Sequence, residues 1–126
     1  MDKPYILAID NGTQSVRALL FDVHGNLVDK AQVGIDSYQP REPGWVENEP
    51  EAFWQSLCTA CQRLWANTRV PKDAIAGAVI TTQRGTLVPL DAKGQPLRPF
   101  IVWMDQRRAQ QTHRLAWWWE SAFKLI

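Results

Sequence analysis

Two apolar runs near the start of the chain, separated by a short polar segment, constrain its fold more than any other feature. Tyr5–Ile9 and Val16–Phe21 are each long enough for a strand and too short for a helix. Between them, Asn11 and Gly12 are a strong hairpin signal, because both residues tolerate positive φ. We therefore predict an antiparallel hairpin whose turn lies at these two residues.

The junction of the predicted hairpin is polar. Asp10 ends the first strand, and period-two geometry places Thr13, Ser15 and Arg17 on one side of the second. An acid that can hold a metal, with small donors and turn amides facing it, suits a polyphosphate. A purely structural hairpin is the alternative, because short motifs of this kind also occur without a function.

A third strand and a helix are expected next. Leu27–Ile35 would complete an antiparallel three-strand meander. Ser37–Glu49 is expected to be a loop that is anchored by Trp45. A helix is predicted from Pro50 to about Asn67, because apolar residues recur there at helical spacing. These core-facing residues are Phe53, Trp54, Leu57, Cys58, Cys61, Leu64 and Trp65.

More strands are predicted in the second half of the chain. Ile75–Thr82 is almost wholly apolar or small, which is typical of a buried parallel strand. Thr86–Leu90 and Leu97–Trp103 are each expected to be strands as well. Asp105 is expected to cap a final helix that begins at Gln106. The predicted fold class is therefore α/β.

Composition narrows the function classes. The 126 residues carry a net charge of +1, so a nucleic-acid partner is not expected. No run approaches membrane-spanning length and no leader precedes the first strand, so we predict a cytoplasmic protein without a membrane partner. Cys58 and Cys61 lie mid-helix, far from both histidines, and are expected to be inert core thiols rather than a zinc or redox pair.

Four blocks of residues, in order, resemble the N-terminal part of the FGGY carbohydrate kinases. They are Ala8–Arg17, Pro43–Glu47 with Pro50, Thr81–Thr86, and Arg98–Arg107. The resemblance implies the ribonuclease-H-like, actin-like ATPase fold, with a partial N-terminal lobe made of the meander, the helix and the further strands. It also implies that residues 1–126 are a truncated first lobe, with the rest of that lobe and the second lobe absent.

The resemblance further implies an ATP-dependent kinase that phosphorylates a sugar or polyol hydroxyl and uses Mg²⁺. Asp10 would hold the magnesium through water. The implied phosphate-binding residues are Asp10, Gly12, Thr13, Gln14, Ser15 and Arg17. The implied acceptor-binding residues are Gln83, Arg84, Trp103 and Asp105. The family's general base would lie beyond Ile126, so this stretch is expected to contain no catalytic residue and to be inactive alone.

The acceptor block departs from two patterns of the family. Glycerol kinases look like Gln-Arg-Glu there, whereas this chain has Gly85 in the third position. Xylulose kinases look like Gln-Met-His, whereas this chain has Arg84 in the second. Because the glycine leaves room and removes a hydrogen-bond acceptor, we predict a sugar or polyol larger than glycerol.

Other interpretations remain open at this point. An actin-like or chaperone-like ATPase shares the hairpin motif but not the other blocks, and a non-catalytic binding remnant is a further alternative. Arg84 is either a pocket residue or a surface residue, Trp103 is either a pocket wall or core, and Arg107 and Arg108 are expected on a solvated helix face. Because of its unpaired strand edges and the Trp117–Trp119 run, we expect the chain to dimerise into a homo-oligomer, to aggregate, or to leave its tail mobile.

Overall fold

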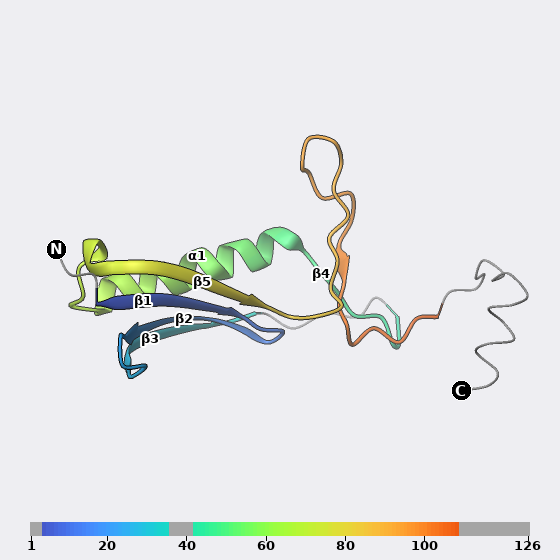
Figure 1. Ribbon diagram of the computed structural model, residues 1–126. Coiled ribbons are helices and arrows are strands. Elements are labelled where there is room, and N and C mark those ends of the chain that lie inside the picture. Colours follow the sequence, from blue (N-terminus) through green and yellow to red (C-terminus); the bar gives the residue numbers. More distant parts are fainter. Residues whose placement is uncertain (1–3, 36–41, 109–126) are drawn as a thin grey trace, which may run out of the picture.

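The computed structural model of the protein describes residues 4–35 and 42–108, which form a four-stranded sheet, one long helix and a small second sheet (Figure 1). The Trp117–Trp119 run lies outside the described residues. No helix within the described ranges is long and apolar enough to cross a membrane.

The main sheet has the order β3-β2-β1-β5. Strands β1 (Tyr5–Asn11), β2 (Ser15–Asp22) and β3 (Leu27–Gly34) pair antiparallel in sequence order. Strand β5 (Ile75–Thr82) pairs parallel with β1, so the carboxyl ends of these two strands lie side by side. The predicted three-strand meander and the predicted parallel strand are both confirmed.

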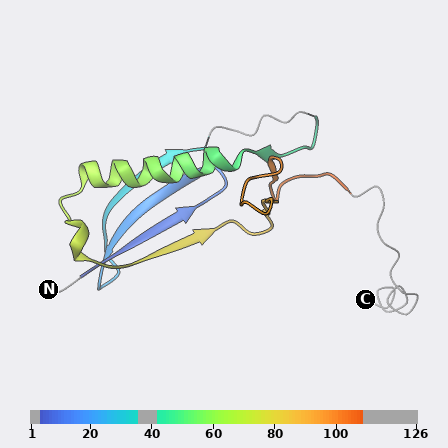
Figure 2. The ribbon, with the colours of Figure 1, turned by 90° about the horizontal axis from the view of Figure 1, so that it is seen from above.

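Helix α1 (Pro50–Asn67) covers one face of the sheet, over β2 and β3 (Figure 2). It begins with Pro50 in its first turn, where the missing N–H costs no helical hydrogen bond. Phe53, Ala60 and Leu64 are buried against β2, but Trp54 is exposed, so its predicted place in the core is wrong. Trp54 directly follows Phe53, and successive helical residues point in directions about 100° apart, so Phe53 enters the core while Trp54 faces outward.

The two cysteines of α1 are free and half-buried. Burial raises the pKa of the Cys61 thiol, and the nearby Cys58 adds to that increase. A thiol with a raised pKa has little thiolate at neutral pH, and thiolate is the reactive form. The predicted inert thiols fit this environment.

The first hairpin turns two residues later than predicted. Asn11 still belongs to β1, and the Gly12 N–H donates to the Ser15 carbonyl at 3.1 Å, so the tip is Thr13-Gln14. Neither Asn11 nor Gly12 has a positive φ. Glycine is favoured at position 12 for a different reason, because a Cβ there would lie only 3.1 Å from the Ser15 carbonyl oxygen, which is a tight contact.

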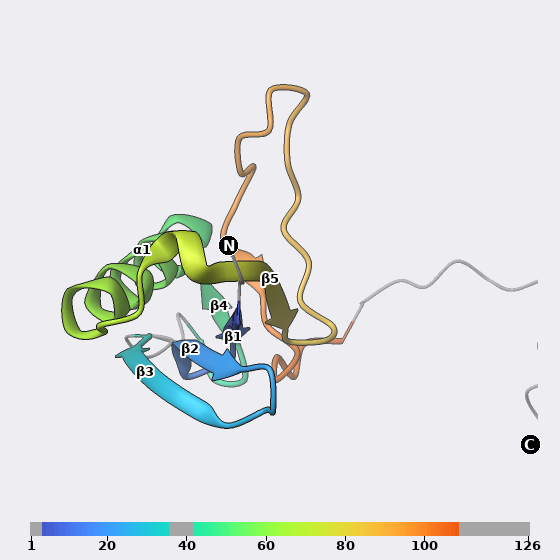
Figure 3. The same ribbon diagram turned by 60° about the vertical axis from the view of Figure 1, so that its left-hand side comes forward.

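Strand β5 has the predicted position but not the predicted burial. Val79 and Ile80 are 51% and 53% exposed, respectively. The strand lies at the edge of the sheet beside β1, whereas α1 packs over β2 and β3, toward the other edge (Figure 3). No element within the described part of the chain therefore buries the apolar side chains Val79 and Ile80 of this strand.

The second sheet consists of two short strands, β4 (Glu47–Asn48) and β6 (Phe100–Ile101), which pair antiparallel. The longer strands predicted at Thr86–Leu90 and Leu97–Trp103 are wrong. Outside Phe100–Ile101, these segments form only isolated bridges. Leu87 bridges to Ile101 of β6, but most of the segment between β5 and β6 extends away from both sheets (Figures 1 and 3). Its prolines lack the N–H that a ladder needs.

The predicted helix start at Gln106 is also wrong for the described residues, because Gln106–Arg108 are not helical. The other short helical element is a 3₁₀ turn, η1 (Lys72–Ala74), which lies between α1 and β5. Asp105 does not cap a helix. Its carboxylate accepts a hydrogen bond from the backbone N–H of Val46, on a segment that lies 59 residues away in the sequence.

Candidate functional site

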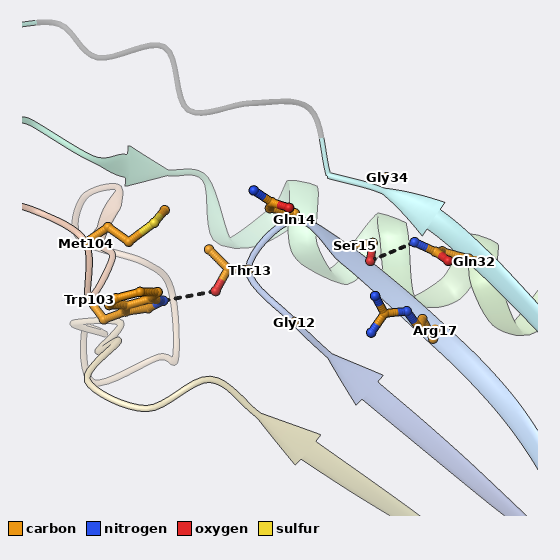
Figure 4. Close-up of a pocket in the computed structure, with 9 residues that line it drawn as sticks. All are labelled: Gly12, Thr13, Gln14, Ser15, Arg17, Gln32, Gly34, Trp103 and Met104. Atoms are coloured by element: carbon orange, nitrogen blue, oxygen red, sulfur yellow. Dashed lines mark hydrogen bonds between the residues drawn. The ribbon is translucent and has the colours of Figure 1, made fainter.

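A cavity of about 450 Å³ opens at the tip of the first hairpin (Figure 4). It is formed by the β1–β2 turn, the start of β2, the end of β3 and the segment after β6. The lining residues are Gly12, Thr13, Gln14, Ser15, Arg17, Gln32, Gly34, Trp103 and Met104. The structure thus brings five of the six predicted phosphate-binding residues together around this hairpin cavity.

The sixth predicted residue, Asp10, lies beside the hairpin cavity at the end of β1. Arg17 Nη1 donates to Asp10 Oδ2 at 2.7 Å, because the two residues are direct partners in the β1–β2 register. Thr81 lies on β5 and is the register partner of Asp10 there. Its Oγ1 donates to Asp10 Oδ1 at 2.9 Å. The Asp10 and Arg17 side chains are 39% and 45% exposed, so both remain within reach of a ligand.

Asp10 is a single carboxylate, and the described residues contain no group of three or more His, Cys, Asp or Glu side chains that would hold a metal. Magnesium is usually bound by one or two carboxylates together with substrate phosphates and waters. The donor set therefore fits a magnesium ion that arrives with a nucleotide and does not fit a site built from protein ligands alone.

Ser15 is held in place from the neighbouring strand. Gln32 Nε2 on β3 donates to Ser15 Oγ at 3.0 Å, and Ser15 is buried. A hydroxyl that accepts one hydrogen bond keeps its own proton available for another acceptor. Ser15 can therefore donate into the hairpin cavity.

Gln83 and Trp103 meet Thr13 from two distant parts of the chain. Thr13 Oγ1 donates to Gln83 Oε1 at 3.1 Å, and Trp103 Nε1 donates to Thr13 Oγ1 at 3.0 Å. Figure 4 shows the indole of Trp103 aimed at the Thr13 hydroxyl across the mouth of the cavity. These two hydrogen bonds join the hairpin tip to the residues that the sequence places in an acceptor pocket.

A second cavity of about 440 Å³ shares Trp103 with the hairpin cavity. Gln83, Arg84, Gly85 and Trp103 line it, and we refer to it as the acceptor-side cavity. Trp103 is 58% exposed, so it forms a wall and is not a core residue. Gly85 has a φ of +70°, and a Cβ there would lie 3.4 Å from the Cβ of Trp103. The glycine is therefore both conformationally required and close to the wall of the cavity.

A cluster of charged residues, which we call the Arg107 clamp, fixes the segment behind this wall. Arg107 binds Asp105 at 2.7 Å and Glu47 at 2.8 Å, and its guanidinium stacks on Trp45 at 4.2 Å. Asp105 also accepts from the Val46 N–H at 2.7 Å. The clamp joins the loop before β4 to the segment after β6, which carries Trp103.

The Arg107 clamp changes two of the sequence interpretations. Arg107 is partly buried in ion pairs and does not lie on a solvated helix face. Both carboxylate oxygens of Asp105 accept hydrogen bonds from Arg107, and this bonding holds the pKa of Asp105 well below its usual range. The contacts of Asp105 thus position the polypeptide. Asp105 does not line the acceptor-side cavity, but it lines a neighbouring cavity of about 450 Å³ with Gly85, Trp103 and Arg107, and its predicted role in acceptor binding stays a prediction.

We expect the substitution Arg107→Ala to lower the melting temperature at neutral pH. The folded-state pKa of Asp105 lies below its unfolded value, so the clamp stabilises the fold above the ordinary aspartate pKa of about 4. This contribution is lost as the pH falls through the folded value. The deficit of the variant should therefore narrow in acid.

Thermal melts between neutral pH and pH 3 test this expectation. Arg98→Ala is the matched control, because Arg98 is exposed and, among the described residues, bonds only the carbonyl of its neighbour Pro99. A deficit in Arg107→Ala that is equal at all pH values would contradict the electrostatic account.

Several residues of the site were not singled out from the sequence. Thr81 and Gln32 contact predicted site residues from neighbouring strands, and Met104 lines the hairpin cavity. For Gln32 a signal was present, because Lys30, Gln32 and Gly34 alternate with apolar residues along β3. For the contacts of Arg107 with Glu47 and Trp45 no local signal exists, since these residues are about 60 positions away.

The chain was compared with known families and proteins. Residues 5–121 match the model of the N-terminal domain of the FGGY family of carbohydrate kinases. A glycerol kinase from Alkalilimnicola ehrlichii is 42% identical over 106 residues, which cover 83% of this chain and 21% of that protein. The chain therefore spans about a fifth of the length of this relative.

Solved structures show the same likeness. A crystal structure described as a xyloylose kinase from Brucella ovis matches with a TM-score of 0.71 and 33% identity, over 82% of this chain and 21% of that one. The Plasmodium falciparum glycerol kinase with ADP matches with a TM-score of 0.66 and 29% identity, over the same shares. These likenesses confirm the α/β, actin-like ATPase fold class predicted from the sequence.

Proposed function

Because the chain belongs to the FGGY family of carbohydrate kinases, we propose that it supplies the first phosphate loop and part of the acceptor pocket of an enzyme that phosphorylates a sugar or polyol with ATP and Mg²⁺. One observation carries the proposal. Trp103 lines both the hairpin cavity and the acceptor-side cavity, so a phosphate and an acceptor hydroxyl bound there would be neighbours.

In this proposal, residues 1–126 are the N-terminal part of the first lobe of a longer kinase. The covered fifth of the relatives' length supports this assignment. The group that removes the proton from the acceptor hydroxyl would lie in the remainder of that kinase. Its absence would leave the stretch described here as a binding element without a base, and positioning alone accelerates phosphoryl transfer only in part.

Each residue of the hairpin has a defined task under this proposal. The backbone of Gly12–Ser15 would face the phosphates, as in other turns that present N–H groups to an anion. Arg17 would leave Asp10 and bind a phosphate oxygen, since guanidinium groups pair well with phosphates. Asp10 would then hold the nucleotide's magnesium through water, and this ion would neutralise phosphate charge.

The acceptor side has fewer polar groups. Arg84 and the Gln83 amide offer hydrogen bonds to hydroxyls, and the exposed face of Trp103 offers an apolar surface to the carbon skeleton. An actin-like ATPase that drives conformational change would need the hairpin cavity but not this second cavity. The acceptor-side cavity therefore favours the kinase over the ATPase and over a binding remnant.

The proposed activity is tested with the full-length protein in a coupled assay for ADP release. The acceptor panel contains glycerol, larger polyols, pentuloses and no acceptor. We expect ADP release that depends on both an acceptor and magnesium. Equal ADP release with and without acceptors would identify an ATPase, and no release under any condition would contradict the proposal.

We also expect Gly85→Glu to shift the acceptor preference toward short polyols. A glutamate here would fill space beside Trp103 and add a hydroxyl acceptor, whereas a larger substrate would meet an unmatched carboxylate. The ratio of kcat/KM for glycerol to that for xylulose should rise about tenfold.

Gly85→Ala is the matched control for this change. Both variants force an L residue into the positive-φ position and therefore share the backbone strain, but only one adds a carboxylate. An equal shift in both variants would show that strain, and not the carboxylate, changes the preference. An unchanged ranking of acceptors in Gly85→Glu would contradict the predicted role of position 85.

A further inference from the structure

The Thr13 hydroxyl is the point at which the two cavities are joined. It lies at the tip of the β1–β2 hairpin, whereas Gln83 follows β5 and Trp103 follows β6. The two hydrogen bonds connect residues separated by 70 and 90 positions in the sequence, so they link three independent segments. A ligand in the hairpin cavity that changes the hydrogen bonds of Thr13 must therefore also change the hydrogen bonds of Gln83 and Trp103 in the acceptor-side cavity.

The protons of this group can be counted. An indole N–H only donates, so Trp103 Nε1 takes a lone pair of Thr13 Oγ1. A threonine hydroxyl has one proton, and here it is donated to Gln83 Oε1. A phosphate oxygen at neutral pH only accepts. Thr13 can therefore bond a phosphate through its hydroxyl only by withdrawing the proton from Gln83.

We propose that Thr13 is a positioning residue that couples nucleotide binding to acceptor binding. When a phosphate oxygen takes the Thr13 proton, Gln83 Oε1 loses its donor in the acceptor-side cavity. The freed amide oxygen then accepts a hydrogen bond from an acceptor hydroxyl. Trp103 keeps its bond to Thr13 Oγ1 throughout, so the wall of the cavity stays in place. No covalent bond changes in this exchange.

The proposal, which rests on the proposed kinase function, predicts positive cooperativity between the two substrates. Without nucleotide, an acceptor hydroxyl must share Gln83 Oε1 with Thr13, and an oxygen that already accepts one hydrogen bond accepts a second one less strongly. With nucleotide, the acceptor hydroxyl does not share this oxygen. By thermodynamic linkage, the acceptor strengthens nucleotide binding by the same factor. If the role of Thr13 were merely structural, its loss would weaken acceptor binding equally with and without nucleotide, so the ratio of these two acceptor Kd values would not change.

The test measures acceptor binding to the full-length protein by calorimetry, with glycerol and with xylulose, in the presence and absence of a non-hydrolysable ATP analogue and magnesium. We expect the analogue to lower the acceptor Kd of the wild type about fivefold or more. Thr13→Ser keeps the hydroxyl and should keep this ratio. Thr13→Val removes it at nearly constant shape and should bring the ratio close to one.

Thr59→Val is the control for the loss of a threonine hydroxyl, because Thr59 lies on α1 and lines neither cavity. It should retain the wild-type ratio. If Thr13→Val does not fold, Gln83→Leu answers the same question, since it removes the acceptor of the Thr13 proton and should also abolish the coupling.

Two results would overturn the inference. One is a wild-type acceptor Kd that the analogue does not change. The other is a wild-type ratio retained in a folded Thr13→Val or Gln83→Leu variant. If acceptors are phosphorylated but the ratio survives these substitutions, only the coupling is wrong. If no acceptor in the assay panel is phosphorylated, the proposed function is wrong, and the proposed coupling is then wrong as well.

Discussion

Asp10→Ala is expected to reduce the kcat of the full-length kinase by about 10²- to 10³-fold, the usual cost of removing one positioned electrostatic group. Asp10 is the carboxylate placed between the hairpin cavity and β5, where it contacts Arg17 and Thr81. The fold should survive, because ion pairs between exposed side chains contribute little to stability. The expected loss is therefore one of catalysis, measured as ADP release at saturating ATP and acceptor.

Asp73→Ala provides the matched control for Asp10→Ala. Asp73 lies in η1, outside the residues that line the two cavities, and its removal should leave kcat unchanged. Melting curves of both variants show whether each is folded. An Asp10→Ala enzyme with wild-type kcat would refute the assigned role of Asp10 as the magnesium-holding carboxylate.

Phe100→Ala should have the largest effect on stability, about 3–5 kcal/mol. Phe100 is 3% exposed and packs edge-to-face on Phe53 of α1, with ring centroids 5.0 Å apart. Together with Val102, which is 1% exposed, it joins β6 and the segment carrying Trp103 to the main core. Since small domains are stable by only about 5–15 kcal/mol, a loss of this size removes much of the total.

The measurement is denaturant unfolding of the protein, with Leu97→Ala as the control. Leu97 is three residues away and 66% exposed, so the same kind of truncation should change the free energy of unfolding by less than about 0.5 kcal/mol. Equal effects of the two substitutions would show that Phe100 does not anchor the second sheet to the core.

The predictions for Phe100, Arg107 and Thr13 share one structural basis, which is the position of Trp103. The acceptor wall, Trp103, is exposed and follows a two-residue strand, so little holds it locally. Its position depends on the Phe53–Phe100 contact, on the Arg107 clamp and on the bond to Thr13. Changes at any of these three supports should therefore appear as changes in acceptor binding.

The local elements of this protein were determined by the sequence itself. Alternation and run length identified β1, β2, β3 and β5, because a half-buried strand needs a period of two residues. Helical spacing and Pro50 located α1 to within a residue. The chemistry at the hairpin was also predictable, since Asp10, Thr13, Ser15 and Arg17 are close together in the chain and a turn must gather them.

The tertiary structure decided everything that depends on residues far apart in the sequence. It moved the turn to Thr13-Gln14, because the pairing of Asn11 with Val16 extends β1. It reduced two predicted strands to the two-residue β6 and isolated bridges, since the prolines of these segments cannot donate to a ladder. It also turned Arg107 from an expected surface residue into the clamp and placed Thr13 between Gln83 and Trp103. No periodicity records such contacts, because they arise only when separate segments are packed against one another.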